Sequence, residues 1–126
     1  MVADNFHIKV KEERRDTIMG NEKIFAKIEK AAAKKKSKKI IDVLKKADNE
    51  VLVKALEALG DVADEDSFNT INRFMDYADP EVRIAACKAG LKINTEYMRT
   101  KVRFQLSQEK DAEVKKIILE ELNKTN

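Results

Sequence analysis

The amino-acid sequence predicts an all-α protein, a short right-handed α-solenoid of about three helix pairs plus an N-terminal capping helix. Three observations support this fold class. Among 126 residues, glycine (3) and proline (1) are scarce and 39% of residues are charged, a composition rich in helix formers. A segment of about 31 residues occurs three times. Each copy places apolar side chains at the spacing of one helix face.

The repeat is clearest where its second helix begins. "ADNEVLVKALEALG" starts at Ala47, "ADPEVRIAACKAGL" at Ala78 and "KDAEVKKIILEELN" at Lys110. Such a period indicates helix pairs that stack side by side, because one pair alone cannot bury its apolar face. We therefore expect an A helix and a B helix in each copy. The A helices are predicted at 38–46, 67–77 and 95–108, and the B helices at 49–62, 80–93 and 112–124.

Local signals support the start of each B helix. Asp48, Asp79 and Asp111 are predicted N-caps, since a carboxylate there accepts hydrogen bonds from the free amides of the first turn. Pro80 suits the first helical position, where its missing N–H costs nothing. The packed face is predicted at offsets 0, 4 and 8 from the valine of each copy: Val51, Ala55 and Leu59; Val82, Ala86 and Gly90; Val114, Ile118 and Leu122.

The end of the third copy departs from the other two. Glu121 stands at offset 7, where the first two copies have Ala58 and Ala89. A charged side chain would be costly beneath another repeat. We therefore expect Glu121 to mark the C-terminal end of the stack.

The motifs "DPEVRIAACKAG" (79–90) and "DNEVLVKALEALG" (48–60) resemble the HEAT-like repeats, particularly the short type of the phycobilisome lyases. That pattern reads approximately Asp-Pro-x-Val-Arg-x-x-Ala-x-x-Ala-Leu-Gly. The resemblance covers about residues 37–124 and implies a solenoid whose B helices line a concave surface. It specifies a fold rather than an activity.

The predicted organisation has two parts. Residues 1–20 form an N-terminal arm of uncertain structure, and residues 21–126 form a single HEAT-like domain. Within the domain we expect a capping helix at 21–36 and repeats at 37–63, 64–94 and 95–126.

The residue inventory argues against catalysis. Cys87 and His7 are the only residues of their types, so one chain can build neither a disulfide nor a zinc site from these ligands. We predict no catalytic, cofactor-binding or metal-binding residues. A lyase-type enzyme, implied only by the family association, is a second alternative that would depend on the Cys87 thiol. No apolar run is long enough to span a bilayer and no leader is apparent, so we expect a cytoplasmic protein without membrane contact.

The B helices carry a second apolar stripe, at offsets 2, 5 and 9, nearly opposite the packed face on a helical wheel. Our main hypothesis is a non-catalytic scaffold that binds a partner helix or peptide, or a second copy, through this stripe on the concave face, rimmed by Glu57, Lys88 and Glu120. The alternative is that the stripe is core, because a B helix has neighbours on three sides. The candidate partner-binding residues are Phe25, Val53, Leu56, Ile84, Cys87, Leu91 and Leu119.

A lysine cluster provides the other functional hypothesis. Residues 27–46 contain nine lysines and only two acidic residues, whereas the chain as a whole has a net charge of +3. Clustered lysines favour a nucleic acid or another acidic partner. The opposing interpretation is a solvated helix end, where the helix dipole favours cations. The candidate anion-binding residues are Lys34, Lys35, Lys36, Lys38 and Lys39.

Overall fold

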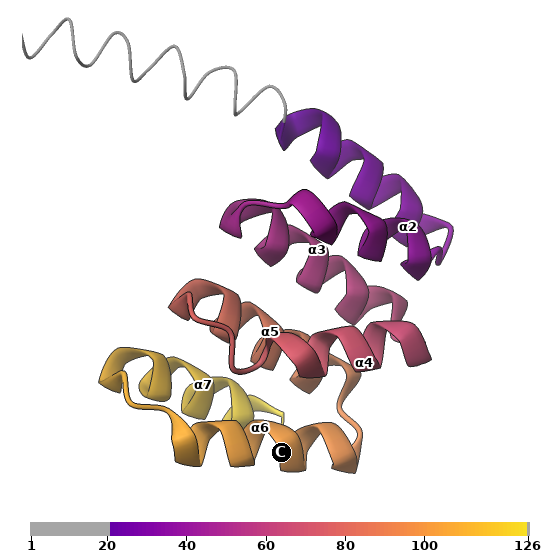
Figure 1. The fold of residues 1–126 in the computed structure, drawn as a ribbon. Helices are drawn as coiled ribbons and strands as arrows, with labels where there is room; N and C mark the ends of the chain where they lie inside the picture. The colour runs from indigo at the N-terminus through magenta and orange to yellow at the C-terminus, as the bar shows by residue number, and fades with distance from the viewer. Residues whose placement is uncertain (1–20, 126) are drawn as a thin grey trace, which may run out of the picture.

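The computed structural model describes residues 21–125, and over this part of the chain it confirms an all-α solenoid (Figure 1). A first helix occupies 21–33. The A helices are α2 (Ser37–Val43, extended by the 3₁₀ turn η1, Leu44–Lys46), α4 (Glu65–Phe74) and α6 (Glu96–Gln108). The B helices are α3 (Asn49–Val62), α5 (Pro80–Ile93) and α7 (Ala112–Lys124). The predicted N-terminal arm, 1–20, lies outside the described residues.

The predicted caps of the B helices are confirmed. The Asp48 carboxylate accepts a hydrogen bond of 2.9 Å from the amide three residues on. Asp79 and Asp111 each accept from the amides two and three residues on, at 2.9–3.2 Å. Pro80 occupies the first turn of α5 as expected. Because these signals are local, all three B helices begin and end where the sequence predicted.

The A helix of the second repeat was predicted less well. It begins at Glu65 rather than at residue 67, because Asp64 is its N-cap and accepts from the Ser67 amide at 2.8 Å. The same carboxylate accepts from the Ser37 hydroxyl at 2.6 Å, which joins the starts of α4 and α2. Burial opposes ionisation of Asp64, but these hydrogen bonds from Ser37 and Ser67 outweigh it and lower its pKa. Asp64 therefore fixes both the start of α4 and its position beside the first repeat.

The helices stack in two rows, visible in Figure 1 as the A row (α2, α4, α6) and the B row (the 21–33 helix, α3, α5, α7). Packing is closest within the B row: α3 lies extensively against α5, and α5 against α7, whereas neighbouring A helices touch much less. A Cβ added at Gly60 of α3 would lie 3.2 Å from both the Cα and the Cβ of Ala89 in α5. Because the B helices stand closer together than the A helices, the stack curves with its B side on the concave surface.

The predicted packed face forms the core. All nine residues at offsets 0, 4 and 8 of the three B helices are buried. Ile28 of the first helix and Ile40 of α2 extend the same core towards the N-terminus, and Met98 and Val102 of α6 extend it towards the C-terminus. The core is therefore continuous across the repeats, as a solenoid requires.

The predicted role of Glu121 is wrong. This residue lies on the side of α7 that faces α5, where its carboxylate is 4.0 Å from Lys88 and 3.3 Å from Lys124. Offset 7 faces the preceding B helix, as the contact between Ala89 and Gly60 also shows. The opposite side of α7 instead carries exposed Lys116, Leu119 and Asn123.

Candidate protein-interaction surface

The predicted apolar ladder is largely core, and for three of its residues the partner-binding hypothesis is wrong. Leu56 and Cys87 are 0% exposed and Leu91 is 2% exposed. Offsets 5 and 9 face the next B helix, so these side chains are covered by the following repeat rather than presented to solvent. The other members differ: Phe25, Val53 and Ile84 are half-buried against the core, and Leu119 at the end of the stack is 44% exposed.

The burial of Cys87 also decides its chemistry. Removal from water raises the pKa of the Cys87 thiol to about 12, and the nearby Glu109 carboxylate adds to this shift. A thiol with such a pKa stays protonated and is a poor nucleophile at neutral pH. His7, its only possible histidine partner, lies outside the described residues. Cys87 is therefore a packing residue, and the lyase alternative loses the nucleophile on which it depended.

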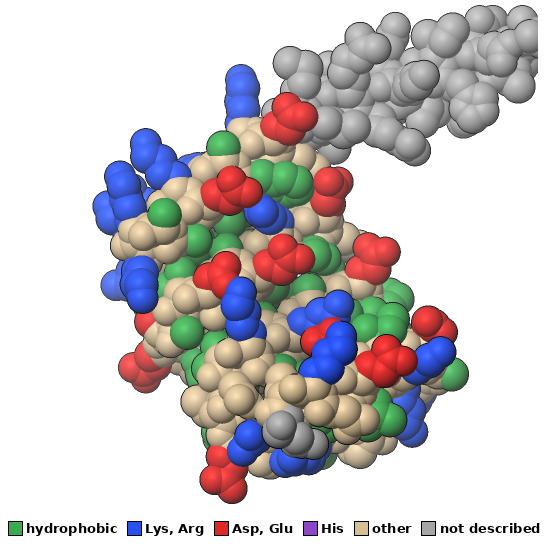
Figure 2. All heavy atoms as spheres, turned by 180° about the vertical axis from the view of Figure 1, so that it is seen from behind, with side chains coloured by type: hydrophobic (Ala, Val, Ile, Leu, Met, Phe, Trp, Pro, Cys, Tyr) green, Lys and Arg blue, Asp and Glu red, His purple; other side chains and the backbone are tan. Residues whose placement is uncertain are grey.

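The exposed side of the B row is charged rather than apolar. Residues that we expected at the rim of an apolar groove, Glu57 and Lys88, stand in the middle of this surface. Figure 2, which views the molecule from behind, shows acidic and basic side chains mixed over it. We call this surface the B face and define it by the charged residues of α3 and α5 other than Arg83, which pairs with Glu109: Glu50, Lys54, Glu57, Asp61, Glu81, Lys88 and Lys92.

Ion pairs connect each B helix to the next across the B face. Lys54 of α3 lies 2.9 Å from Glu29 of the first helix, and Lys92 of α5 pairs with Asp61 of α3. Both pairs are partly or largely exposed to solvent, so each contributes little to stability. Their main effect is electrostatic: they neutralise some charged side chains of the B face and leave others without a partner.

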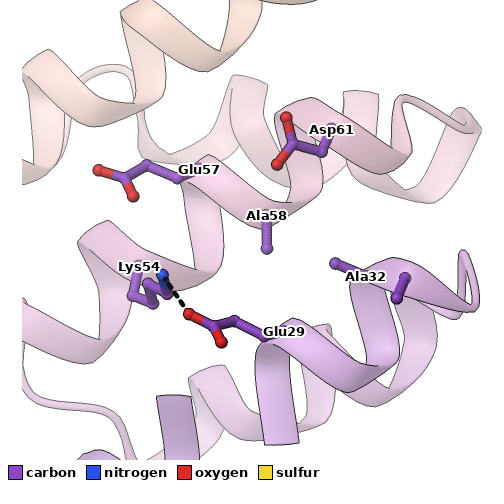
Figure 3. Close-up of a pocket in the computed structure, with 7 residues that line it drawn as sticks. Glu29, Ala32, Lys54, Glu57, Ala58 and Asp61 are labelled. Carbon is purple, nitrogen blue, oxygen red and sulfur yellow. Dashed lines mark ion pairs between the residues drawn. The ribbon is translucent and has the colours of Figure 1, made fainter. Parts of the chain in front are cut away.

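An acidic hollow of about 320 Å³ lies between the first helix and α3 (Figure 3). Ala32, Ala33 and Ala58 form its apolar part, and its polar part has three carboxylates and one ammonium. We define the acidic hollow by its lining residues: Glu29, Ala32, Ala33, Lys54, Glu57, Ala58 and Asp61.

The carboxylates of the acidic hollow differ in their partners. Glu29 binds Lys54 and Asp61 binds Lys92, but Glu57 makes no ion pair with any side chain that the structure describes. The hydrogen bond from Lys54 to Glu29, together with the charges of Glu57 and Asp61, raises the pKa of Lys54 despite some desolvation. Lys54 therefore stays charged, and the hollow keeps an excess of negative charge centred on Glu57.

The predicted lysine cluster borders two neighbouring hollows. Lys35 and Lys38, together with Lys36 and Lys39, line a hollow of about 380 Å³ that also contains Asp64 and Asp66. Lys34 instead joins Lys27 and Lys30 of the first helix in a second hollow. Sequence reasoning missed these two lysines, although their spacing to Lys34, seven and four residues, places all three on one helix face. We define the lysine hollow, about 260 Å³ in volume, by its lining residues: Lys27, Lys30, Ala31, Lys34, Lys36 and Lys39.

Residues 21–125 contain no group of three or more histidine, cysteine or acidic side chains arranged to hold a metal ion. None of the described helices combines the length and the apolar character needed to cross a bilayer.

Comparison with known proteins identifies the repeat. The family model for HEAT repeats matches residues 37–123, which includes all three helix pairs. No curated protein matches the chain, and no solved structure does. HEAT repeats generally serve as protein-interaction scaffolds. With the family model covering more than half of the sequence and the helix pairs folded as that family requires, the chain belongs to the HEAT repeat family.

Proposed function

We propose that this protein is a non-catalytic interaction scaffold that binds a basic segment of a partner protein on its B face. One observation carries the proposal: the acidic hollow combines an alanine floor with a carboxylate, Glu57, that has no ionic partner among the described residues. A single thiol that is buried and protonated suits a reducing compartment, so the proposal includes a cytoplasmic location.

The hollow has the chemistry to take one arginine or lysine side chain. The methylene groups of such a side chain would lie over Ala32 and Ala58, and its charged end would reach Glu57. An arginine could form a two-pronged hydrogen bond with the carboxylate. Asp61 could join it, because its present pair with Lys92 is solvent-exposed and easily exchanged.

Parts of the predicted ladder remain in the proposal as secondary contacts. Val53 and Ile84 are half-buried and lie one turn before Glu57 and Lys88 on the same side of their helices. A partner helix that crosses the B face would place apolar side chains against them. Phe25 and the exposed Leu119 are further candidates, and a second copy of this chain is an alternative partner.

Selection from a displayed library of random helical peptides tests the proposal. Peptides that bind the wild-type protein should be enriched in arginine and lysine at one position. Their affinity for a Glu57→Gln/Asp61→Asn variant should fall at least about tenfold, since a hydrogen bond between charged groups contributes about 1.5–3 kcal/mol. Binding would be measured by fluorescence anisotropy of the labelled peptide.

The matched control removes the same charge elsewhere. Glu65 and Glu96 are exposed residues in the first turns of α4 and α6, in the A row, so Glu65→Gln/Glu96→Gln should leave peptide affinity unchanged. Selected peptides without a basic preference, or equal losses of affinity in both double variants, would contradict the proposal. Circular dichroism melts of each variant establish that a loss of binding is not a loss of fold.

A further inference from the structure

The lysine hollow lies at the N-terminal end of the stack and concentrates charge of one sign. Its five lysines come from two elements: Lys27 and Lys30 from the first helix, Lys34 from the turn after it, and Lys36 and Lys39 from the start of α2. All five are exposed, and none makes an ion pair with any residue in 21–125. No acidic side chain lines this hollow, although Lys36 and Lys39 also border the neighbouring hollow that contains Asp64 and Asp66. In Figure 2 basic side chains gather at the upper left, the side on which the loop before α2 lies.

Helix stability accounts for only part of this arrangement. Lys30 and Lys34 stand at the C-terminal end of the first helix, where cations interact favourably with the helix dipole. Lys36 and Lys39 stand at the start of α2, where the dipole disfavours cations and the first turn contains no acidic residue. Neither the dipole nor ion pairing within the described chain explains why lysines from both helix ends converge on one hollow.

We propose that the lysine hollow binds the phosphate backbone of a nucleic acid duplex without sequence preference. Lys27, Lys30 and Lys34 extend over the last two turns of the first helix and the turn after it, about 10 Å along the helix axis. A duplex presents about six negative charges over that length, so several phosphates can be neutralised at once. Because the hollow has no aromatic side chain for stacking and no arginine for reading base edges, contact is with phosphates alone.

Two other anionic partners fit less well. A membrane surface would be expected to take up an apolar side chain beside the lysines, but the exposed large hydrophobic residues of the described chain, Tyr77, Tyr97, Phe104 and Leu119, all lie on other elements. An acidic protein surface presents carboxylates at irregular spacing, whereas a duplex presents phosphates continuously along its axis, which better suits a row of lysines. Lysine, a compact point charge, suits phosphates whose exact position varies.

Fluorescence anisotropy with a labelled 20-base-pair DNA duplex of arbitrary sequence tests the proposal. The wild-type chain should bind at 50 mM salt, and a duplex of unrelated sequence should bind equally well. Raising the salt to 200 mM should weaken binding roughly 40-fold if three phosphates are neutralised and roughly 500-fold if five are. Undetectable binding at 50 mM salt would overturn the proposal.

Paired variants locate the binding site. Lys30→Gln/Lys34→Gln should weaken binding at least about tenfold and lower the slope of log Kd against log salt by about 2. Lys115→Gln/Lys116→Gln removes the same charge from exposed positions of α7, at the far end of the stack, and should change both quantities little. Equal effects in the two variants would mean that only net charge matters, which would overturn the assignment to this hollow.

Competition distinguishes nucleic acid from other polyanions. Neither polyglutamate nor vesicles containing 30% phosphatidylserine should displace the duplex at matched charge concentration. Displacement by either would overturn the proposal in favour of an acidic protein or a membrane. The inference is independent of the peptide site: Glu57→Gln/Asp61→Asn should weaken peptide binding at least about tenfold and leave duplex binding intact, so each proposal can fail without the other.

Discussion

The two rows of the solenoid pack their helices differently. In the B row small residues allow close approach, as where Gly60 of α3 meets Ala89 of α5. In the A row large rings separate the helices: the rings of Phe68 in α4 and Tyr97 in α6 lie with their centroids 5.1 Å apart, and a groove of about 250 Å³ remains further along, between residues 72–76 and 101–105. Side-chain size on the two sides of one repeat therefore sets the direction in which the stack curves. The same difference leaves charge exposed on the concave side and aromatic rings exposed on the convex side.

The largest effect is expected in the middle of the B row. Leu56 is fully buried between repeats, so Leu56→Ala should lower the free energy of unfolding by about 2–5 kcal/mol through lost burial and a residual cavity. Leu119 occupies the same offset in the last repeat but is 44% exposed, so Leu119→Ala should cost less than about 1 kcal/mol. Urea unfolding of both variants measures the difference. Similar losses of unfolding free energy in the two variants would mean that the position of a repeat in the stack does not determine how much the residue at this offset stabilises the fold.

The second largest effect should come from the ion pair that joins the two rows. Arg83 of α5 donates from Nε and Nη2 to the two carboxylate oxygens of Glu109, just after α6, at 2.9 and 3.0 Å. The Glu109 side chain is only 3% exposed. Arg83→Met would leave this carboxylate without its partner and should cost about 1.5–3 kcal/mol in urea unfolding. Arg83→Lys keeps the positive charge but not the two parallel hydrogen bonds of the guanidinium, so we expect an intermediate loss of stability. Unchanged stability in Arg83→Met would show that the ion pair does not hold the rows together.

The pH dependence of stability checks the same contact. Burial would raise the pKa of Glu109, but the hydrogen bonds from Arg83 and from the Asp111 amide, and the Arg83 charge, hold it below its ordinary value of 4.5. A carboxyl group whose pKa is lower in the folded state stabilises the protein above its unfolded pKa and loses that contribution as the pH falls through its folded pKa. The stability advantage of wild type over Glu109→Gln should therefore be constant near neutral pH and shrink below pH 4.5. An advantage that does not vary down to pH 3 would contradict this interpretation.

The distance along the chain between interacting residues explains what could be predicted from sequence. Caps such as Asp79 and the packed face at Val82 and Ala86 depend on residues near in sequence, so the pattern alone located them. The burial of Leu56 and Cys87 depends on how closely the next B helix approaches, which no local pattern records.

The two hollows depend on the same long-range geometry. Glu29 and Glu57 line one hollow although 27 other residues separate them in the sequence. Lys30 and Lys39 meet only because the chain reverses between the first helix and α2. Sequence reasoning found the packed face at offsets 0, 4 and 8 but not the burial at offsets 5 and 9, and both hollows arise where faces from different helices meet.

A smaller effect is expected at the turns that lead from one row to the other. Ala63 and Asn94 end α3 and α5 in the left-handed conformation, both with φ of 57°. Alanine is strained there and glycine is not, so Ala63→Gly should raise the free energy of unfolding by about 1 kcal/mol. Asn94→Gly should gain less, because asparagine tolerates this conformation better than other residues do. Thermal unfolding of both variants tests the order, and destabilisation by Ala63→Gly would contradict it.

The smallest effect is expected on the exposed side of the A row. Phe104 of α6 borders the groove between α4 and α6 and is 63% exposed, so its ring buries little apolar surface in the chain. Phe104→Ala should therefore change the free energy of unfolding by no more than about 0.5 kcal/mol. Leu106, half-buried two residues later, provides the control: Leu106→Ala should cost more than Phe104→Ala in the same urea titration although its side chain is smaller. The reverse order would mean that the aromatic ring supports the A row after all, and that the wide spacing of the A helices is held by Phe104 as well as by the stacked Phe68 and Tyr97.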